Sequence, residues 1–251
     1  MEKTTGSTEE LREVFAEAAD SGGYTEVTAE YREFGEMKVK WIRCGKTINF
    51  FVSDYLSDAP RNVLESMART IVSKICACGD ADYSPELIEW LTSDEFPRKK
   101  QGIYLSRRPT VIPAPEFEYK DPRESCRRIA DAGLVREDDG MCVCWDTDVK
   151  YGYAGRYSVL MKVAGIAKGL DTDEISDEAF DLAVYSVILH IAMGFSPASP
   201  ERAAEYEKRL DLFPQREILE EELKRAGYHL RCPPGANTPF HSTAVTPISG
   251  H

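Results

Sequence analysis

The stretch DEAFDLAVYSVILHIAM, from Asp177 to Met193, is apolar on nearly every side when it is wound as a helix. Ser176 stands directly before it, and serine is a favourable N-cap residue. A helix that is apolar all round is buried at the centre of a fold instead of lying on its surface. We therefore predict a buried central helix over residues 177–193, around which the other elements pack.

Strand and helix patterns surround this segment. Residues 24–52 are rich in aromatic and β-branched side chains, and Gly35 and Gly45 divide them into about three strands, which predicts an antiparallel meander. A further strand is predicted at residues 142–145. Apolar periodicity, proline positions and cap residues predict helices over residues 8–19, 60–75, 84–92, 121–132, 201–209 and 215–225.

These elements predict the fold class and the domain organisation. We expect a single α+β domain over residues 1–232, in which an antiparallel strand meander packs on a buried central helix with flanking helices. Residues 233–251 contain no Asp, Glu, Lys or Arg and are rich in proline. Because such a segment has no core of its own, we expect it to be a flexible C-terminal tail.

The composition is that of an acidic globular protein. The chain has 251 residues, with 31 Lys and Arg against 43 Asp and Glu, so its formal net charge is −12. Its longest apolar stretch is interrupted by Asp181, Ser186 and His190, which argues against a membrane span. The first residues lack the apolar region of a secretion signal, so we expect a cytoplasmic protein. The odd number of cysteines, seven, favours reduced thiols over a disulfide framework.

His190 is the candidate for chemistry, because it lies inside the most strongly predicted helix. Ser186 precedes it by one turn on the same face. Three interpretations are open: a buried imidazole with one hydrogen bond, the remnant of a metal site, and a Ser186–His190 nucleophilic dyad. Nothing in the sequence marks a third group or an oxyanion hole for the dyad. The glycine-rich loops of nucleotide-binding proteins and the nucleophile elbow of serine hydrolases are also absent from the sequence.

Three segments carry a resemblance to a known family. They are RYSVLMKVAGIAKGLDTDEISDEAFDLAVYSVILHIAMGF (156–195), FFVSDYLSDAPRNVLESMARTIVSKI (50–75) and EYEKRLDLFPQREILEEELKRAG (205–227). The first resembles the core of the SprT-like zinc metallopeptidases of the archaeal, zincin-like type, in which a hairpin precedes a helix bearing His-Glu-x-x-His. The other two resemble the strand and Asp-Ala-Pro helix before that core and the Phe-Pro-containing helices after it. The resemblance implies a zincin-like fold and descent from a zinc-dependent peptidase.

The chain departs from the family motif at its catalytic positions. Laid on the motif, Ser186 takes the place of the first zinc ligand, Val187 that of the general-base glutamate, and His190 that of the second ligand. Where the family has its third ligand, this chain offers only Glu201 and Glu205 as weak candidates. A zinc hydrolase needs three protein ligands and a carboxylate to move the proton of bound water. We therefore expect a catalytically inactive relative with no cofactor, which binds a peptide or protein partner.

Two alternatives stay open beside that expectation. One is a metal-binding hydrolase that uses His190 with a non-standard ligand set. The other is a nucleic-acid-associated protein, because the SprT-like family includes members that act on DNA-bound proteins. The only support for this alternative is the segment 98–108, which contains no Asp or Glu. Its five basic residues are Arg98, Lys99, Lys100, Arg107 and Arg108. The net charge weakens this alternative, and we expect the segment to be a solvated loop or a hairpin edge.

The cysteines offer a separate metal hypothesis. Cys76 with Cys78 and Cys142 with Cys144 form two Cys-x-Cys pairs, whose thiolates could hold zinc or an iron–sulfur cluster. Structural zinc sites usually have a wider Cys-x2–4-Cys spacing. Cys142 and Cys144 share one face of the predicted strand, as any residues two apart do. The sequence therefore favours small buried thiols at both pairs.

Overall fold

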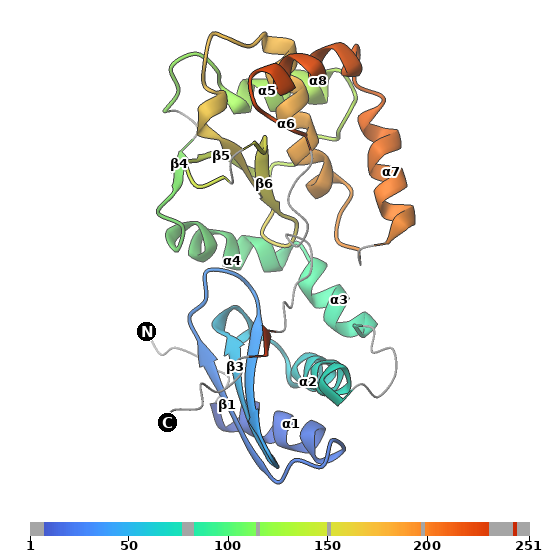
Figure 1. Ribbon diagram of the computed structural model, residues 1–251. Coiled ribbons are helices and arrows are strands. Elements are labelled where there is room, and N and C mark those ends of the chain that lie inside the picture. The colour runs from blue at the N-terminus through green and yellow to red at the C-terminus, as the bar shows by residue number, and fades with distance from the viewer. Residues whose placement is uncertain are drawn as a thin grey trace, which may run out of the picture. The chain divides into compact units, whose positions relative to one another are not determined.

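In the computed structural model the chain is α+β, which confirms the predicted fold class (Figure 1). The structure describes residues 8–76, 83–113, 116–149, 152–196, 199–230 and 243–244. These residues form eight α-helices and two mixed sheets of four strands each. The contacts group the chain into two compact units, Met1–Ser93 with Pro239–His251 and Asp94–Thr238. The sequence predicts one domain over residues 1–232, and this stays a prediction.

The first unit combines a mixed sheet with three helices. Its elements are α1 (Thr8–Asp20), β1 (Glu26–Arg32), β2 (Val39–Cys44), β3 (Thr47–Ser53), α2 (Arg61–Cys76), α3 (Pro85–Thr92) and β8 (Thr243–Ala244). A 3-10 helix, Asp54–Leu56, follows β3. Helix α1 packs on β1 and α2, and the rings of Phe15 and Phe50 meet with centroids 4.4 Å apart. This unit therefore has an apolar core of its own.

The predicted antiparallel meander over residues 24–52 is wrong in its strand order. The sheet has the order β1-β3-β2-β8, and β1 pairs in parallel with β3, while β2 pairs with β3 in the antiparallel sense. Strand β3 lies between β1 and β2, and its alternate side chains Ile48, Phe50 and Val52 are all fully buried. These strands belong to the first unit, whereas the predicted central helix belongs to the second.

Part of the predicted tail also forms regular structure. Thr243 and Ala244 make the short strand β8, which pairs in parallel with Lys40 and Trp41 of β2. The expectation of a flexible tail over residues 233–251 stays a prediction. The rest of residues 233–251 lies outside the described part of the chain.

The second unit is built around α6. Its elements are α4 (Glu95–Ser106), β4 (Val111–Pro113), α5 (Pro122–Asp131), β5 (Cys142–Asp146), β6 (Gly155–Ser158), β7 (Val163–Ala167), α6 (Asp177–Ala192), α7 (Pro200–Leu210) and α8 (Arg216–Arg225). The 3-10 helix Lys168–Leu170 follows β7. The sheet has the order β4-β5-β7-β6, with β5 and β7 parallel and the outer pairs antiparallel. Helix α6 contacts β6 and β7 as well as α5, α7 and α8, so the prediction of a buried central helix is confirmed.

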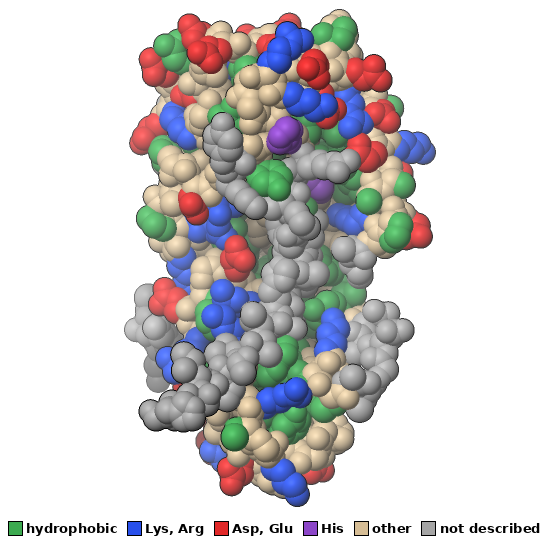
Figure 2. Space-filling model, in the orientation of Figure 1, with side chains coloured by type: hydrophobic (Ala, Val, Ile, Leu, Met, Phe, Trp, Pro, Cys, Tyr) green, Lys and Arg blue, Asp and Glu red, His purple; other side chains and the backbone are tan. Residues whose placement is uncertain are grey.

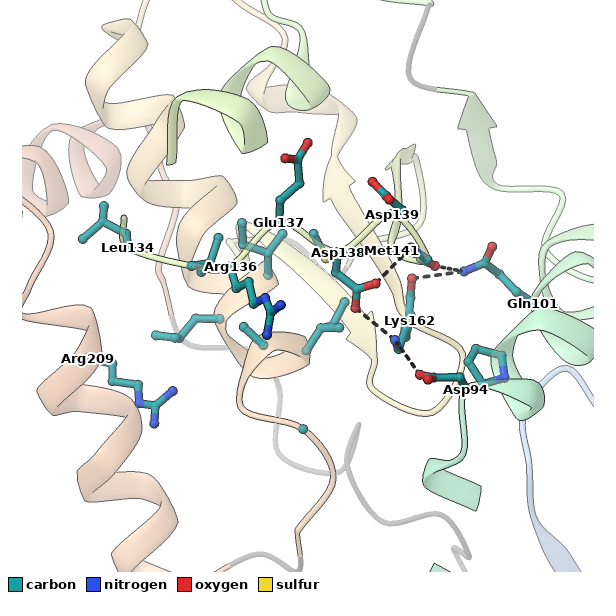
Figure 3. Close-up of a pocket in the computed structure, with 18 of the residues that line it drawn as sticks. Asp94, Gln101, Leu134, Arg136, Glu137, Asp138, Asp139, Met141, Lys162 and Arg209 are labelled. Atoms are coloured by element: carbon teal, nitrogen blue, oxygen red, sulfur yellow. Dashed lines mark hydrogen bonds and ion pairs between the residues drawn. The ribbon is translucent and has the colours of Figure 1, made fainter. Parts of the chain in front are cut away.

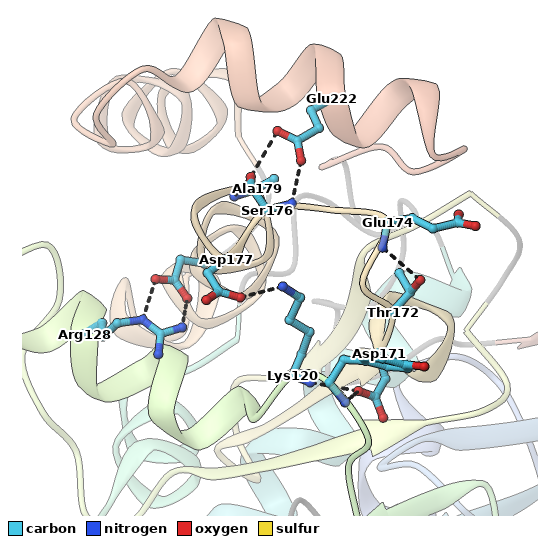
Figure 4. Close-up of polar contacts among 11 residues, drawn as sticks. Lys120, Arg128, Asp171, Thr172, Glu174, Ser176, Asp177, Ala179 and Glu222 are labelled. Carbon is cyan, nitrogen blue, oxygen red and sulfur yellow. Dashed lines mark hydrogen bonds and ion pairs between the residues drawn. The ribbon is translucent and has the colours of Figure 1, made fainter.

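A polar network holds the start of α6 (Figure 4). The Ser176 hydroxyl accepts a hydrogen bond from the Ala179 N–H at 3.1 Å, as predicted for an N-cap, and Glu222 of α8 accepts from Ser176 in turn. Asp171 accepts hydrogen bonds from the backbone N–H groups of residues 118, 119 and 120. Burial alone would raise the pKa of Asp171, but the Lys168 ion pair and these donors outweigh it and lower the pKa to about 2.

Further ion pairs join the same end of the helix to the segment before α5 and to α5 itself. Lys120 contacts Asp177 at 2.5 Å, and Arg128 binds both carboxylate oxygens of Asp181, at 2.8 and 2.6 Å. A bidentate arginine–carboxylate pair fixes the relative orientation of its two side chains in addition to pairing their charges. The start of α6 is thus held from two sides, which sets the direction of its C-terminal half.

The basic segment is a helix, so the expectation of a solvated loop or hairpin edge is wrong. Arg98, Lys99 and Lys100 lie in α4, where Phe96, Lys100 and Tyr104 share one buried face at a spacing of four residues. The sequence pattern conceals this face because a lysine occupies its middle position. Among the described residues, no helix is both long enough and apolar enough to cross a membrane.

Candidate functional site

Ser186, which the resemblance places at the first zinc ligand, is fully buried in α6. Its hydroxyl donates a hydrogen bond to the carbonyl oxygen of Ala183, one turn earlier in the same helix, at 2.7 Å. Its own carbonyl oxygen accepts a hydrogen bond from the Tyr206 hydroxyl of α7 at 3.0 Å. The serine hydroxyl is therefore directed at the helix backbone, and not at His190 as a nucleophilic dyad would require.

Val187, at the position of the general base, packs directly on strand β6. It is fully buried, and a Cβ added to Gly155 would lie 2.8 Å from Val187 Cγ2 and 2.5 Å from the Gly165 carbonyl oxygen. Helix α6 can approach the sheet this closely only because Gly155 has no side chain. The space beside residue 187 is filled by the backbone of β6, so the site has no opening for water there.

His190, at the position of the second ligand, lies between two aromatic rings. The Tyr157 ring of β6 stacks on one face at a centroid distance of 4.0 Å and the Tyr206 ring of α7 on the other at 4.1 Å. Both pairs are nearly parallel, with interplanar angles of 13° and 10°. Burial, and then the charge of Arg202, lower the pKa of His190 to about 3. The imidazole is therefore neutral at physiological pH, and a metal cation beside it would meet the Arg202 charge.

Glu201 and Glu205 do not join His190. They lie four residues apart on α7, whereas Tyr206 and Arg202, which face His190, occupy another side of that helix. Glu205 accepts a hydrogen bond from Arg209 at 2.6 Å. Within the described part of the chain, no three His, Cys, Asp or Glu side chains gather where they could hold a metal ion.

The sequence analysis missed a groove along the C-terminal half of α6 (Figure 3). It has a volume of about 1230 Å³. Its apolar floor comes from α6, and its walls come from α4 and from the loop 133–141 that follows α5. The floor residues are Ile188, Leu189, Ile191 and Ala192. One sequence feature could have indicated the groove. The apolar residues Leu134 and Val135 stand directly before the charged run 136–139, in a segment without strand or helix periodicity.

The walls of the groove are tied together by polar contacts. The Gln101 side-chain amide of α4 donates to the carbonyl oxygens of Gly140 and Met161, both at 2.9 Å. Lys162, in the turn between β6 and β7, binds Asp138 at 3.0 Å and Asp94 at 3.7 Å. Loop 133–141 is thus fixed to α4 and to the β6–β7 turn before any ligand binds.

The charged side chains that line the groove point in different directions. In Figure 3, Arg136 and Arg209 point into the space over α6, whereas Glu137 points away from it. Asp138 is already paired with Lys162. The apolar floor is therefore flanked by two guanidinium groups, although the chain as a whole is acidic.

The five basic residues of the nucleic-acid alternative do not form one surface. Arg98 lines the groove, Lys99 pairs with Glu95 at 2.8 Å, and Lys100 is only 6% exposed. Arg108 lies over the Tyr104 ring, 4.4 Å from its centroid. Figure 2 shows acidic and basic side chains interspersed on the visible face of the described residues. Because consecutive residues of a helix point in different directions, basic residues that are neighbours in the sequence do not form one basic surface patch.

The two cysteine pairs differ in their surroundings. Cys76 lies at the end of α2 and is half-buried, while Cys78 is outside the described residues. Cys142 and Cys144 lie on β5 and share a face, as predicted, and both are free thiols.

Comparisons of the chain with protein-family models, with curated proteins and with solved structures find no match. The resemblance to the SprT-like metallopeptidases therefore stays a prediction.

Proposed function

We propose that this chain is a catalytically inactive relative of a zinc-dependent metallopeptidase and that it binds a peptide or protein segment. The observation that carries the first part is the packing of Val187 against the backbone of β6 at Gly155. Hydrolysis at a zinc site needs an open coordination position and a carboxylate beside it. Val187 supplies no proton acceptor, and the space that a carboxylate and a water molecule would need is occupied.

The groove along α6 supports the second part of the proposal. Pockets for small molecules have volumes of roughly 300–1,000 Å³. The groove, at about 1230 Å³, exceeds that range and suits a segment of polypeptide. Its walls are held in place by Gln101 and Lys162, so little conformational entropy is lost when a ligand binds.

The charges of the groove define the chemistry of the partner. Arg136 and Arg209 flank an apolar floor, so the best occupant is a peptide with an acidic residue next to apolar side chains. Arg209 also binds Glu205 at 2.6 Å, which leaves Arg136 as the stronger contact for a carboxylate. We infer that an acidic, apolar peptide segment binds along the C-terminal half of α6.

A peptide selection tests the proposal. The full chain would be used to select binders from a random peptide library displayed on phage, and their affinities would be measured by fluorescence anisotropy. Ala192→Trp fills the floor of the groove and Arg136→Glu reverses its charge, so each should weaken binding at least tenfold. The matched controls are Ala204→Trp on α7 and Arg127→Glu on α5, both at exposed positions that do not line the groove.

Two results would contradict the proposal at different points. Selected peptides that bind Ala192→Trp and Arg136→Glu as tightly as the unchanged chain would mean that the groove is not the binding site. Elemental mass spectrometry of protein purified without chelator tests the other part. One zinc per chain, lost in His190→Ala, would contradict the inactive relative and favour the metal-binding hydrolase.

A further inference from the structure

Lys162 holds a backbone conformation that residues other than glycine rarely adopt. Its φ is 49°, in the left-handed region, where the Cβ atom crowds the following carbonyl oxygen. The surroundings impose this conformation, because the Lys162 carbonyl oxygen accepts hydrogen bonds from the Cys142 N–H at 2.8 Å and from the Gln101 side-chain amide at 3.3 Å. Backbone strain that is imposed in this way is concentrated at functional sites.

The side chain of Lys162 lies at the groove along α6, where its ammonium group contacts two carboxylates (Figure 3). It binds Asp138 Oδ2 at 3.0 Å and Asp94 Oδ1 at 3.7 Å. Asp138 Oδ1 in turn accepts a hydrogen bond from the Gly140 N–H at 2.9 Å. The lysine stem also runs beside Gly140, since a Cβ added there would lie 3.6 Å from Lys162 Cδ. Lys162 thus holds the C-terminal end of loop 133–141.

The same ion pair sets the charge that a ligand of the groove meets. Four acidic and four basic residues line the described part of the groove, so the loss of one cation makes its net charge negative. The Lys162 side chain is 27% exposed, so solvent screens its charge less than that of a fully exposed lysine. A glycine at position 162 would suit the backbone, but Asp138 would then repel an acidic ligand.

We propose that Lys162 is a positioning residue of the groove, which fixes loop 133–141 and selects acidic over basic peptide segments. Its strained backbone is kept for the sake of this side chain, as functional sites in general keep residues that lower the stability of a fold. The selection of acidic segments rests on the proposed function of the groove. The attachment of loop 133–141 does not require a ligand and is tested separately.

Amide exchange followed by NMR tests the attachment of the loop in the full chain without a ligand. The reporters are the N–H groups of Gly140 and Met141, which both donate to Asp138. Lys162→Gly removes the cation, so these two amides should exchange about two- to fivefold faster. Asp138→Asn should have the same effect, and the double variant should add nothing further, because both changes remove one ion pair. Lys162→Arg keeps the cation and should keep the slow exchange.

Gln215→Gly is the matched control. Gln215, before α8, is the other described non-glycine residue with a positive φ, 55°, and it does not line the groove. Both glycine variants relieve the same kind of strain, so neither should lower the urea midpoint. Unchanged exchange in Lys162→Gly, or equally faster exchange in Gln215→Gly, would overturn the attachment of the loop. A lower urea midpoint for Lys162→Gly would contradict the account of the strain.

Peptide affinity tests the charge selection. Fluorescence anisotropy would be measured with an acidic peptide selected on the unchanged chain, and with the same peptide after replacement of each Asp and Glu by Lys. Lys162→Gly should weaken binding of the acidic peptide about two- to tenfold and strengthen binding of the basic one, whereas Gln215→Gly should change neither. Equal affinities of Lys162→Gly and the unchanged chain for both peptides would overturn the selection. A selection that yields no peptide would contradict the proposed function and the charge selection with it, but not the attachment of the loop, which amide exchange decides.

Discussion

Replacing Val187 with glutamate places a carboxylate where the resemblance to the metallopeptidases puts the general base, and it tests how tightly α6 packs on β6. Val187 is fully buried, and its Cγ2 atom lies against the backbone of β6 at Gly155. A glutamate side chain is longer and ionisable, and the packing offers it neither space nor a partner. We expect Val187→Glu to destabilise the second unit strongly and to bring no hydrolytic activity.

The magnitude follows from two contributions. Loss of a buried valine side chain costs about 1.5–3 kcal/mol. An unpaired buried charge costs about 3–5 kcal/mol, unless the carboxyl group stays protonated. The sum, roughly 4.5–8 kcal/mol, is a large part of a typical domain stability of about 5–15 kcal/mol. Because burial raises the pKa of a carboxyl group in the folded state, the cost should be smallest below about pH 4 and should grow as the pH rises toward 7.

Urea unfolding followed by Trp145 fluorescence measures this cost, since Trp145 is fully buried in the second unit. Trp41→Phe and Trp90→Phe would be introduced first, so that only Trp145 reports. Ile218→Glu on α8 is the matched control, because its side chain is 66% exposed and the same charge there should change stability by about 0.5 kcal/mol or less. A Val187→Glu protein within about 1 kcal/mol of the unchanged chain would refute the tight packing of residue 187 against β6.

Three smaller perturbations test the surroundings of this site. Gly155→Ala should cost about 2–3 kcal/mol in urea unfolding, because the new Cβ would lie 2.5 Å from the Gly165 carbonyl oxygen; a near-neutral effect would mean that α6 and β6 are not in such close contact. Tyr206→Phe removes the hydrogen bond to the Ser186 carbonyl and should cost about 0.5–1.5 kcal/mol by the same assay, and a larger loss would indicate that the ring stack is disturbed as well. Asp171→Asn should cost about 2 kcal/mol at pH 7, and since the folded pKa of about 2 lies below the unfolded one, this difference should vanish as the pH falls from about 5 to about 2; a pH-independent difference in unfolding curves would contradict it.

Most helices of this chain could be predicted from the sequence, but α4 and the arrangement of the strands could not. The segment 177–193 was predicted within one residue of α6, because a long apolar pattern after a capping serine has few other solutions. For residues 24–52, the pattern identifies strands and their buried faces but carries no information on which strand lies next to which. The buried face of α4 was concealed for a related reason, since Lys100 breaks its apolar pattern.

The sequence predicts which residues form the candidate site, but not which residues they contact. An apolar helix already implies that Ser186 and Val187 are buried. The two rings that enclose His190 belong to β6 and α7, and no local pattern places Tyr157 and Tyr206 on opposite faces of one imidazole. The groove was missed because loop 133–141 has no periodicity, and its position depends on contacts with α4 and the β6–β7 turn.

The packing around Val187 bears on the proposal that this chain is an inactive relative of a zinc metallopeptidase. A catalytic glutamate and a zinc-bound water need a polar opening beside the helix, and such an opening lowers the apolar burial of the core. With Val187 against Gly155, that opening is replaced by contact between helix and strand. His190 is likewise held by two stacked rings, each pair worth about 0.5–1.5 kcal/mol beyond burial. Introducing the motif residues alone should therefore not produce a zinc peptidase, because β6 would also have to move away from α6.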